Sequence, residues 1–338
     1  MSIDITMVAA IVLPLVVALV VSFLATPIVK SFAYKLGAID VPKDARRMHK
    51  VPIPRMGGLA IFLGFIVSML LFCPLDDQMK GILLGSVIIV VMGIIDDITP
   101  LRASLKFIVQ IFAALIPVYY GVQITCISNP NIFSDNLYWN FGWLSIPITV
   151  VWIVGLTNAV NLIDGLDGLA IGVSTISALT MLVIAILVAE PQVAVVMAAL
   201  VGACIGFMPY NMNPAKIFMG DTGSTFLGYI LACITIQGLF KFYAVISFVV
   251  PFLILGLPIF DTMFAIIGRI SHGQNPMAPD RSHVHHRLID MGLNQKQAVA
   301  VLYVISAILG LSAVVLATSG EIRAILCLLA LVIVALMA

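Results

Sequence analysis

"SIPITVVWIVGLTNAVNLIDGLDGLAIGVSTISALTMLVIAILVA", residues 145–189, consists of two apolar runs joined by a short polar turn. Each run has about the 20 residues that an α-helix needs to cross the hydrocarbon core of a bilayer. Four polar side chains recur at every third residue through the end of the first run and the turn: Asn158, Asn161, Asp164 and Asp167. The stretch therefore predicts two membrane-spanning helices that meet at a polar turn.

The composition extends this prediction to the whole chain. Of its 338 residues, 62% are hydrophobic and 10% are charged, and the mean hydropathy is +1.17. A soluble domain carries about 25% charged residues, and the apolar runs lack the alternation of an outer-membrane barrel. We expect an all-α polytopic integral membrane protein, with one transmembrane domain over residues 1–338. Eleven spans are predicted, at residues 5–29, 57–75, 81–95, 104–121, 145–163, 168–189, 191–210, 223–240, 244–267, 298–318 and 323–338.

The loops between these spans differ in charge on the two sides of the membrane. Residues 1–29 lack a basic start and a cleavage pattern, so we count them as the first span and not as a signal peptide. One side then receives the loops 30–56, 96–103, 164–167, 211–222 and 268–297. In or beside these loops lie 14 of the 17 lysine and arginine residues and all five histidines. The positive-inside rule makes this side cytoplasmic, with the N-terminus outside and the C-terminus inside.

The cytoplasmic side also collects the acidic motifs. In "GIIDDITP", residues 93–100, Asp96 and Asp97 are adjacent. Successive side chains on a helix point about 100° apart, so we expect one acid to face a cavity and the other a neighbouring lysine. The alternative is a solvated helix end before Pro100.

The polar turn "NAVNLIDGLDGLA", residues 158–170, has a stronger pattern. A spacing of three places Asn158, Asn161 and Asp164 as a ribbon along one side of the helix. The accompanying glycines let the backbone approach a ligand closely. A helix cap would account for Asp167 but not for the two asparagines, which lie deeper in the span.

"YNMNPAKIFMGDTGS", residues 210–224, places Asn211, Phe218 and Asp221 just before a span. A helix N-terminus beside an acid can hold a metal-bound phosphate, and the alternative is again a helix cap.

Asp261 is different, because it lies inside the predicted span 244–267. A charge at a helix centre costs about 2.5–3.5 kcal/mol on membrane insertion. We therefore expect Asp261 either to have a functional role or to form a structural hydrogen bond to a neighbouring span.

Two basic segments complete the cytoplasmic set. "APDRSHVHHRL", residues 278–288, contains Arg281, His283, His285 and His286, which suit phosphate or sugar oxygens better than zinc. "RRMHKVPIPRMGG", residues 46–58, contains Lys50. The alternative for residues 278–288 is contact with anionic lipid. The alternative to an anionic-ligand site for residues 46–58 is an ordinary positive-inside loop.

Together these side chains favour phosphoryl transfer. Oxygen ligands without cysteine favour Mg²⁺, with Mn²⁺ as the alternative ion. Surrounding cations would hold the remaining phosphate charge: Lys50, Arg55, Arg102, Lys106, Lys216 and Arg281. A site at the membrane edge can take one reactant from water and the other from lipid. Nothing in the charge distribution calls for a nucleic-acid partner.

Four motifs, "GIIDDI", "NAVNLIDGLDGLA", "FMGDTGSTFLG" and "RSHVHHRL", resemble those of the polyprenyl-phosphate N-acetylhexosamine-1-phosphate transferases. "SHVHHRL" is similar to the form in the branch that makes undecaprenyl-linked GlcNAc for wall teichoic acid, enterobacterial common antigen and O-antigen. The related MurNAc-pentapeptide translocase has three consecutive histidines, and here Val284 interrupts such a run. The resemblance implies transfer of GlcNAc-1-phosphate from UDP-GlcNAc to undecaprenyl phosphate, with Mg²⁺, in a bacterial cell membrane. It also suggests a homodimer in the bilayer.

The resemblance also implies roles for individual residues. Asp221 would ligate the metal, with Asn161 nearby. Asp96 would face the lipid phosphate with support from Asp97, and Asp164 is counted with these catalytic acids. The implied substrate-binding residues are Lys50, Asn158, Asp167, Asn211 and Phe218, and, around the sugar or its phosphate, Arg281, His283, His285 and His286.

Two other functions remain open at this stage. "FMGD" is similar to a motif of intramembrane aspartyl proteases, although such an enzyme needs two acids within spans at equal depth. A secondary transporter would place its polar groups near the bilayer midplane, where only Asp261 fits. UMP release that depends on both Mg²⁺ and polyprenyl phosphate would separate the three functions.

Overall fold

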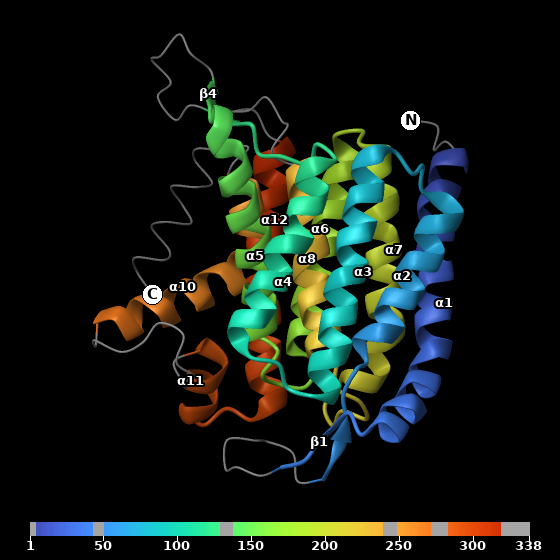
Figure 1. Cartoon of the computed structure of the whole chain (residues 1–338), viewed down its shortest axis with the longest axis vertical. Coiled ribbons are helices and arrows are strands. Elements are labelled where there is room, and N and C mark those ends of the chain that lie inside the picture. Colours follow the sequence, from blue (N-terminus) through green and yellow to red (C-terminus); the bar gives the residue numbers. More distant parts are fainter. Residues whose placement is uncertain (1–4, 43–50, 129–137, 239–248, 272–282, 319–338) are drawn as a thin grey trace.

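The computed structural model describes residues 5–42, 51–128, 138–238, 249–271 and 283–318. Within these ranges the protein consists of twelve α-helices, one short 3-10 helix and two small antiparallel sheets of two strands each (Figure 1). The first seven helices are α1 (Ile5–Leu36), α2 (Gly58–Phe72), α3 (Asp77–Ile98), α4 (Ala103–Tyr119), α5 (Ser145–Leu162), α6 (Leu169–Leu187) and α7 (Pro191–Asn211). The other five are α8 (Gly220–Gly238), α9 (Val249–Ile254), α10 (Gly256–Ser271), α11 (Val284–Asp290) and α12 (Gln295–Thr318). The remaining elements are β1 (Ile39–Asp40), β2 (Ile53–Pro54), β3 (Cys126–Ser128), β4 (Tyr138–Asn140) and η1 (Gly142–Leu144).

The helices agree with an all-α protein that crosses the membrane several times. Among the described residues, six helical segments are long and apolar enough to span a bilayer, namely α1, α3, η1 with α5, α6, α7 and α12. Two more apolar helices, α2 and α4, are shorter. The predicted span 323–338 lies outside the described residues.

The predicted continuous span 244–267 is wrong in one respect. The helix is interrupted between α9 and α10, and α10 leaves the bundle sideways (Figure 1). Pro258 has no backbone N–H and cannot donate to the carbonyl of Ile254, so it weakens the helix at this point. A count of apolar residues does not register such a break.

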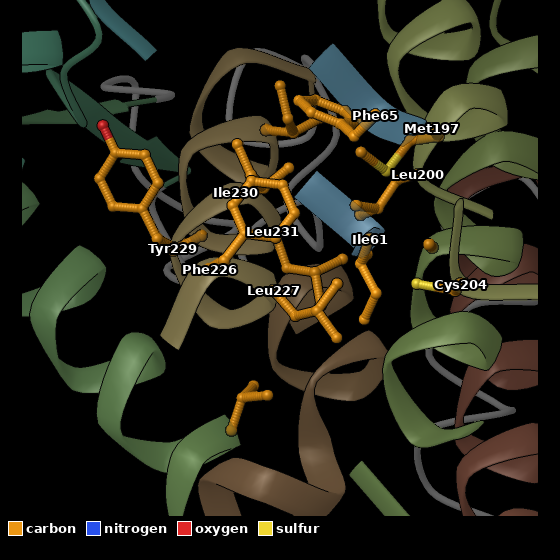
Figure 2. Packing of buried hydrophobic residues seen from close by; sticks show 14 of the residues in the cluster. Ile61, Phe65, Met197, Leu200, Cys204, Phe226, Leu227, Tyr229, Ile230 and Leu231 are labelled. Atoms are coloured by element: carbon orange, nitrogen blue, oxygen red, sulfur yellow. The ribbon is translucent and has the colours of Figure 1, made fainter. Parts of the chain in front are cut away.

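α8 forms the centre of the bundle. All of its residues except Asp221 are buried, and it packs against α2, α3, α5 and α6. Figure 2 shows side chains of α8 facing Ile61 and Phe65 of α2 and Met197 and Leu200 of α7. Tyr229 points the opposite way, toward Gly85 of α3.

Close backbone contact fixes the beginning of α8. A Cβ atom added to Gly58 of α2 would lie 2.0 Å from the backbone nitrogen of Gly223. One added to Gly93 of α3 would lie 2.4 Å from the Cα of Thr222. Small residues allow this approach between membrane helices. The end of α3 is therefore held directly beside the start of α8.

The two ends of the bundle differ in chemistry. α3, α5 and α7 end where α6, α8 and α12 begin, at the end that also carries β1 and α11 (lower in Figure 1). The predicted acidic motifs thus meet at one end. The opposite end exposes Tyr119, Trp139 and Trp143, aromatic residues of the kind enriched at membrane–water interfaces.

Candidate active site

Asp97 is bound to the start of α8. Its Oδ1 accepts a hydrogen bond from the backbone N–H of Asp221 (3.0 Å). Its Oδ2 accepts from the backbone N–H (3.1 Å) and the hydroxyl (2.6 Å) of Thr222. These are the N–H groups that an α-helix leaves without an internal partner. Asp97 is buried and caps α8 from α3, with Arg55 Nε 3.6 Å from its Oδ1.

Gly220 is required at this junction for two reasons. Its φ is +70°, a left-handed conformation that favours glycine. A Cβ atom there would also lie 2.4 Å from Oδ2 of Asp97.

We expect Gly220→Ala to lower both thermal stability and activity, because the added methyl group pushes Asp97 away from α8. Gly268→Ala, where an added Cβ meets no atom within 4 Å, is the matched control and should unfold at the wild-type temperature. Equal unfolding temperatures of the two variants in detergent would contradict this prediction.

Lys106 of α4 joins two acids of the site. Its Nζ lies 3.2 Å from Asp96 Oδ2 and 2.7 Å from Asp221 Oδ2. Asp96 Oδ1 also accepts from the backbone N–H of Leu101 (2.7 Å). The adjacent acids therefore have different partners: Asp96 meets the predicted lysine, whereas Asp97 caps α8 instead of lining the cavity. The sequence placed Lys106 only among the surrounding cations, because it lies inside an apolar span.

A polar cavity of about 350 Å³ opens beside these groups. Its walls are formed by Asp40, Arg55, Asn161, Asp164, Gly165, Leu166, Asp167, Asn211, Phe218, Gly220, Asp221, His286 and Gln295. The α5–α6 turn, the α7–α8 connection, α11 and the start of α12 thus meet at one site. Of the predicted residues, Asn161, Asp164, Asp167, Asn211, Phe218, Asp221 and His286 line this cavity. Asp40 and Gln295 were missed, because neither belongs to a motif that sequence reasoning recognised.

Asp164 lies in the turn between α5 and α6, outside the helices. Burial and the nearby carboxylates of Asp221 and Asp97 raise its pKa to about 7. Both effects disfavour the charged form of an acid. Asp164 is therefore near its titration midpoint at neutral pH, and added positive charge in the cavity would favour its ionised form.

Asparagine side chains organise the cavity wall. The amide nitrogen of Asn161 donates to the hydroxyl of Ser224 on α8 (2.7 Å). The amide nitrogen of Asn213 donates to both Asp167 Oδ2 (3.0 Å) and Gln295 Oε1 (2.8 Å). The Asn211 amide nitrogen donates to the carbonyl of Ile217 (3.0 Å), while its buried Oδ1 has no hydrogen-bond partner. Buried polar atoms are normally paired, so this unpaired acceptor points to a ligand at this wall of the cavity.

The histidines of the "SHVHH" segment have three different environments. His283 Nδ1 lies 2.8 Å from Asp261 Oδ2, and His285 packs against Gly165. Burial and the neighbouring His286 lower the pKa of His285 to about 4. His285 is therefore neutral at pH 7. Among these histidines within the described residues, His286 is the one that lines the cavity.

Asn158 is a predicted residue that faces away from the cavity. The Asn158 amide donates to Gln110 Oε1 (2.6 Å) and to the carbonyl of Val154 (2.8 Å). A step of three residues rotates about 60° around the helix, which turns Asn158 toward α4 while Asn161 faces the cavity. Its role in substrate binding stays a prediction. Lys50 and Arg281 lie outside the described residues.

The donor set suits a metal that takes part of its shell from a ligand. Within the described residues, no group of three or more histidine, cysteine, aspartate or glutamate side chains is arranged to hold a metal ion. Mg²⁺ usually takes one or two protein carboxylates and completes its shell with water and substrate phosphates. Asp221 and Asn161 both line the cavity and offer oxygen donors of this kind.

Comparison with known proteins places the chain in a family. The model described as glycosyl transferase family 4 matches residues 79–239, from α3 to just beyond the end of α8. The chain is also 44% identical over 307 residues to the "Probable undecaprenyl-phosphate N-acetylglucosaminyl 1-phosphate transferase" of Bacillus subtilis, covering 90% of this chain and 85% of that protein. This chain belongs to glycosyl transferase family 4. It is therefore a multi-pass membrane transferase, which excludes the protease and the transporter.

Other relatives in glycosyl transferase family 4 differ in the transfer that their names describe. The decaprenyl-phosphate N-acetylglucosaminephosphotransferase of Mycobacterium tuberculosis is 33% identical over 319 residues, covering 85% of this chain and 77% of that protein. A phospho-N-acetylmuramoyl-pentapeptide-transferase of Caldicellulosiruptor bescii is 36% identical over 235 residues, covering 67% of this chain and 72% of that protein. The family segment contains Asp96, Asp97, Asp164 and Asp221, which meet at the site.

Proposed function

We propose that this protein transfers GlcNAc-1-phosphate from UDP-GlcNAc to undecaprenyl phosphate. The products are GlcNAc-pyrophosphoryl-undecaprenol and UMP, and the reaction would begin synthesis of a cell-envelope glycopolymer. The observation that carries the proposal is the convergence of Asp96, Asp221 and Lys106 beside one polar cavity. The 44% identity to the Bacillus subtilis relative supports GlcNAc as the sugar.

The polar cavity suits the nucleotide sugar. Its volume of about 350 Å³ is within the range of small-molecule sites. Phe218 offers an aromatic face, and the unpaired Asn211 Oδ1 can accept a hydrogen bond. We assign these two residues, with Asp167 and Lys50, to the uridine. His286, which lines the cavity, is assigned to the sugar and its phosphate. For His283, His285 and Arg281 the same role stays a prediction.

A second, apolar cavity suits the lipid. It has a volume of about 720 Å³ and follows η1 and α5 from Leu144 to Ala159, with Phe252 of α9 and Met263 of α10 also lining it. Ala159 is two residues before Asn161, which lines the polar cavity. A prenyl chain in this cavity would therefore have its phosphate near Asp96 and Lys106.

Filling the apolar cavity should weaken lipid binding selectively. A Cβ atom added to Gly155 meets no atom within 4 Å, so a larger side chain there enters the cavity without a backbone clash. We expect Gly155→Leu to raise the KM for undecaprenyl phosphate by about 10-fold, the effect of losing about 1.4 kcal/mol of binding. The KM for UDP-GlcNAc should not change. Gly268→Leu in α10 is the control, and equal lipid KM values for the two variants would contradict this assignment.

Mg²⁺ is assigned to Asp221 and the side-chain oxygen of Asn161. The bound ion would neutralise charge on the pyrophosphate as UMP leaves. The ammonium of Lys106 lies between Asp96 and Asp221, and a lysine ammonium has three N–H donors. Its third donor would hold a neighbouring phosphate oxygen. Phosphoryl transfer depends mainly on this kind of positioning and charge stabilisation.

We infer direct displacement. An oxygen of the lipid phosphate attacks the β-phosphorus, and the bond from that phosphorus to the UMP oxygen breaks with its electron pair on UMP. A phosphate monoester has a second pKa near 6, so it is largely ionised at neutral pH and needs little help from a base. Asp96 then mainly orients the nucleophile. A phosphosugar–enzyme trapped from UDP-GlcNAc without lipid would instead support two steps through an aspartyl-phosphate.

We also propose the orientation in the membrane. The excess of lysine and arginine places the active-site end at the cytoplasmic face, in a bacterial plasma membrane crossed by eleven spans. The N-terminus is then outside and the C-terminus in the cytoplasm. A homodimer is the assembly that we expect.

The decisive assay measures UMP released by the purified protein from UDP-GlcNAc. Release should require both undecaprenyl phosphate and Mg²⁺, and EDTA should stop it. UDP-GalNAc in place of UDP-GlcNAc tests the choice of sugar. UMP formed without the lipid acceptor, or no UMP with every component present, would reject the proposed function.

A further inference from the structure

Asp261 is a buried acid that the reaction described above does not use. Its Oδ2 lies 2.8 Å from His283 Nδ1, and its Oδ1 accepts from the backbone N–H of Val284 (2.7 Å). The side chains of Asp261 and His283 are both buried. Both carboxylate oxygens are therefore engaged by the first residues of one segment, which is distant in sequence.

This contact determines where α11 begins. α11 has seven residues, and His283 at its N-cap makes no capping hydrogen bond with its own side chain. So short a helix is not stable by itself and depends on tertiary contacts. The carboxylate of Asp261 supplies the missing acceptor from α10, which the break after α9 directs toward α11 (Figure 1).

The position of α11 in turn shapes the polar cavity. His285 follows in α11 and packs so closely on Gly165 that a Cβ there would lie 2.4 Å from its Nε2. His286 is the next residue and forms part of the cavity wall. A shift of α11 would therefore move His286 and release the contact with the α5–α6 turn.

Asp261 also selects the protonated nitrogen of His283. A carboxylate oxygen beside Nδ1 requires Nδ1 to carry the proton. In the neutral ring, Nε2 is then unprotonated and can accept a hydrogen bond. An asparagine at residue 261 could still accept from Val284, but its amide would present N–H to Nδ1 and favour the opposite tautomer. The asparagine and alanine variants therefore separate two contributions of the same side chain.

We propose that Asp261 is a positioning residue of the transferase, which acts through His283 and the Val284 amide to hold His286 at the nucleotide-sugar site. This inference rests on the proposed function for its kinetic consequence, but the contact itself can be tested without turnover. It also explains why a charged residue is retained inside an apolar segment, where the cost of insertion is high.

The kinetic test compares Asp261→Ala and Asp261→Asn in the UMP assay. Asp261→Ala should raise the KM for UDP-GlcNAc and lower kcat/KM by about 100-fold, the effect of misplacing a binding group by about 1 Å. Asp261→Asn should lose about 10-fold and shift the pH profile, because it retains the α11 contact but not the tautomer. Neither should change the KM for undecaprenyl phosphate. Phe264→Leu, an exposed position of the same helix, should behave as wild type.

Hydrogen exchange supplies the readout that does not depend on activity. Amide exchange over residues 284–290 should rise in Asp261→Ala and remain near wild type in Asp261→Asn and Phe264→Leu. Unchanged exchange in Asp261→Ala, or increased exchange with an unchanged KM for UDP-GlcNAc, would overturn the inference. If the wild type releases no UMP, the proposed function fails, while the exchange result still decides whether Asp261 holds α11.

Discussion

Asp221→Asn is expected to lower UMP release by about 1000-fold, the scale of losing a central charge-stabilising group. The variant removes the charge that Lys106 contacts at 2.7 Å and the carboxylate assigned to Mg²⁺. Its fold should persist, because Asp97 binds the backbone N–H of Asp221 and not its side chain. The loss should therefore be in turnover and in Mg²⁺ dependence.

The measurement is initial UMP release over a range of Mg²⁺ concentrations, together with thermal unfolding in detergent. Glu190→Gln, an exposed acid that precedes α7 at the other end of the bundle, is the control and should keep wild-type activity. An Asp221→Asn protein that remained active with the wild-type Mg²⁺ dependence would remove the metal assignment.

Asp97→Ala is expected to lower the free energy of unfolding by about 3–5 kcal/mol, as when one partner of a buried charged contact is removed. The substitution leaves two backbone N–H groups and the Thr222 hydroxyl without their acceptor at the start of α8. Because α8 is the central helix, the loss affects the packing of the whole bundle. Activity should fall as well, since Asp221 is the second residue of that helix.

Denaturant or thermal unfolding of the purified protein tests this expectation. Asp77→Ala is the matched control, because Asp77 is at the opposite end of α3 and pairs with Lys80 on the surface. Such exposed pairs contribute little to stability, because water screens the two charges. If Asp97→Ala and Asp77→Ala unfolded alike, the capping role of Asp97 would be refuted.

Much of the architecture could be predicted from local properties of the chain. The length of each apolar run gave the helices from α1 to α8 and α12, with ends that differ by several residues. The parity of the loops predicted that the acidic motifs would share one end, and they do. The motifs themselves indicated the family, which the relatives confirm.

The partner that each polar side chain contacts within the site could not be predicted in this way. The sequence separates Asp96 from Asp97 by one residue, but it does not say that Asp97 caps α8 while Asp96 meets Lys106. Likewise it gives Asn158 and Asn161 the same spacing, although only Asn161 reaches the cavity. In each case the outcome depends on which neighbouring helix the side chain faces.

The sequence by itself determined the class of protein, the approximate spans and the gathering of the acidic motifs at one end of the bundle. These follow from the burial of apolar side chains in lipid and from motif order, which are properties of short segments. The tertiary structure alone decided the pairing of Asp97 with α8, the sideways turn of α10 and the contact of Asp261 with α11. Each of these depends on hydrogen-bonding groups that are far apart in the chain and come together only when glycines let the helices approach or a proline interrupts a helix.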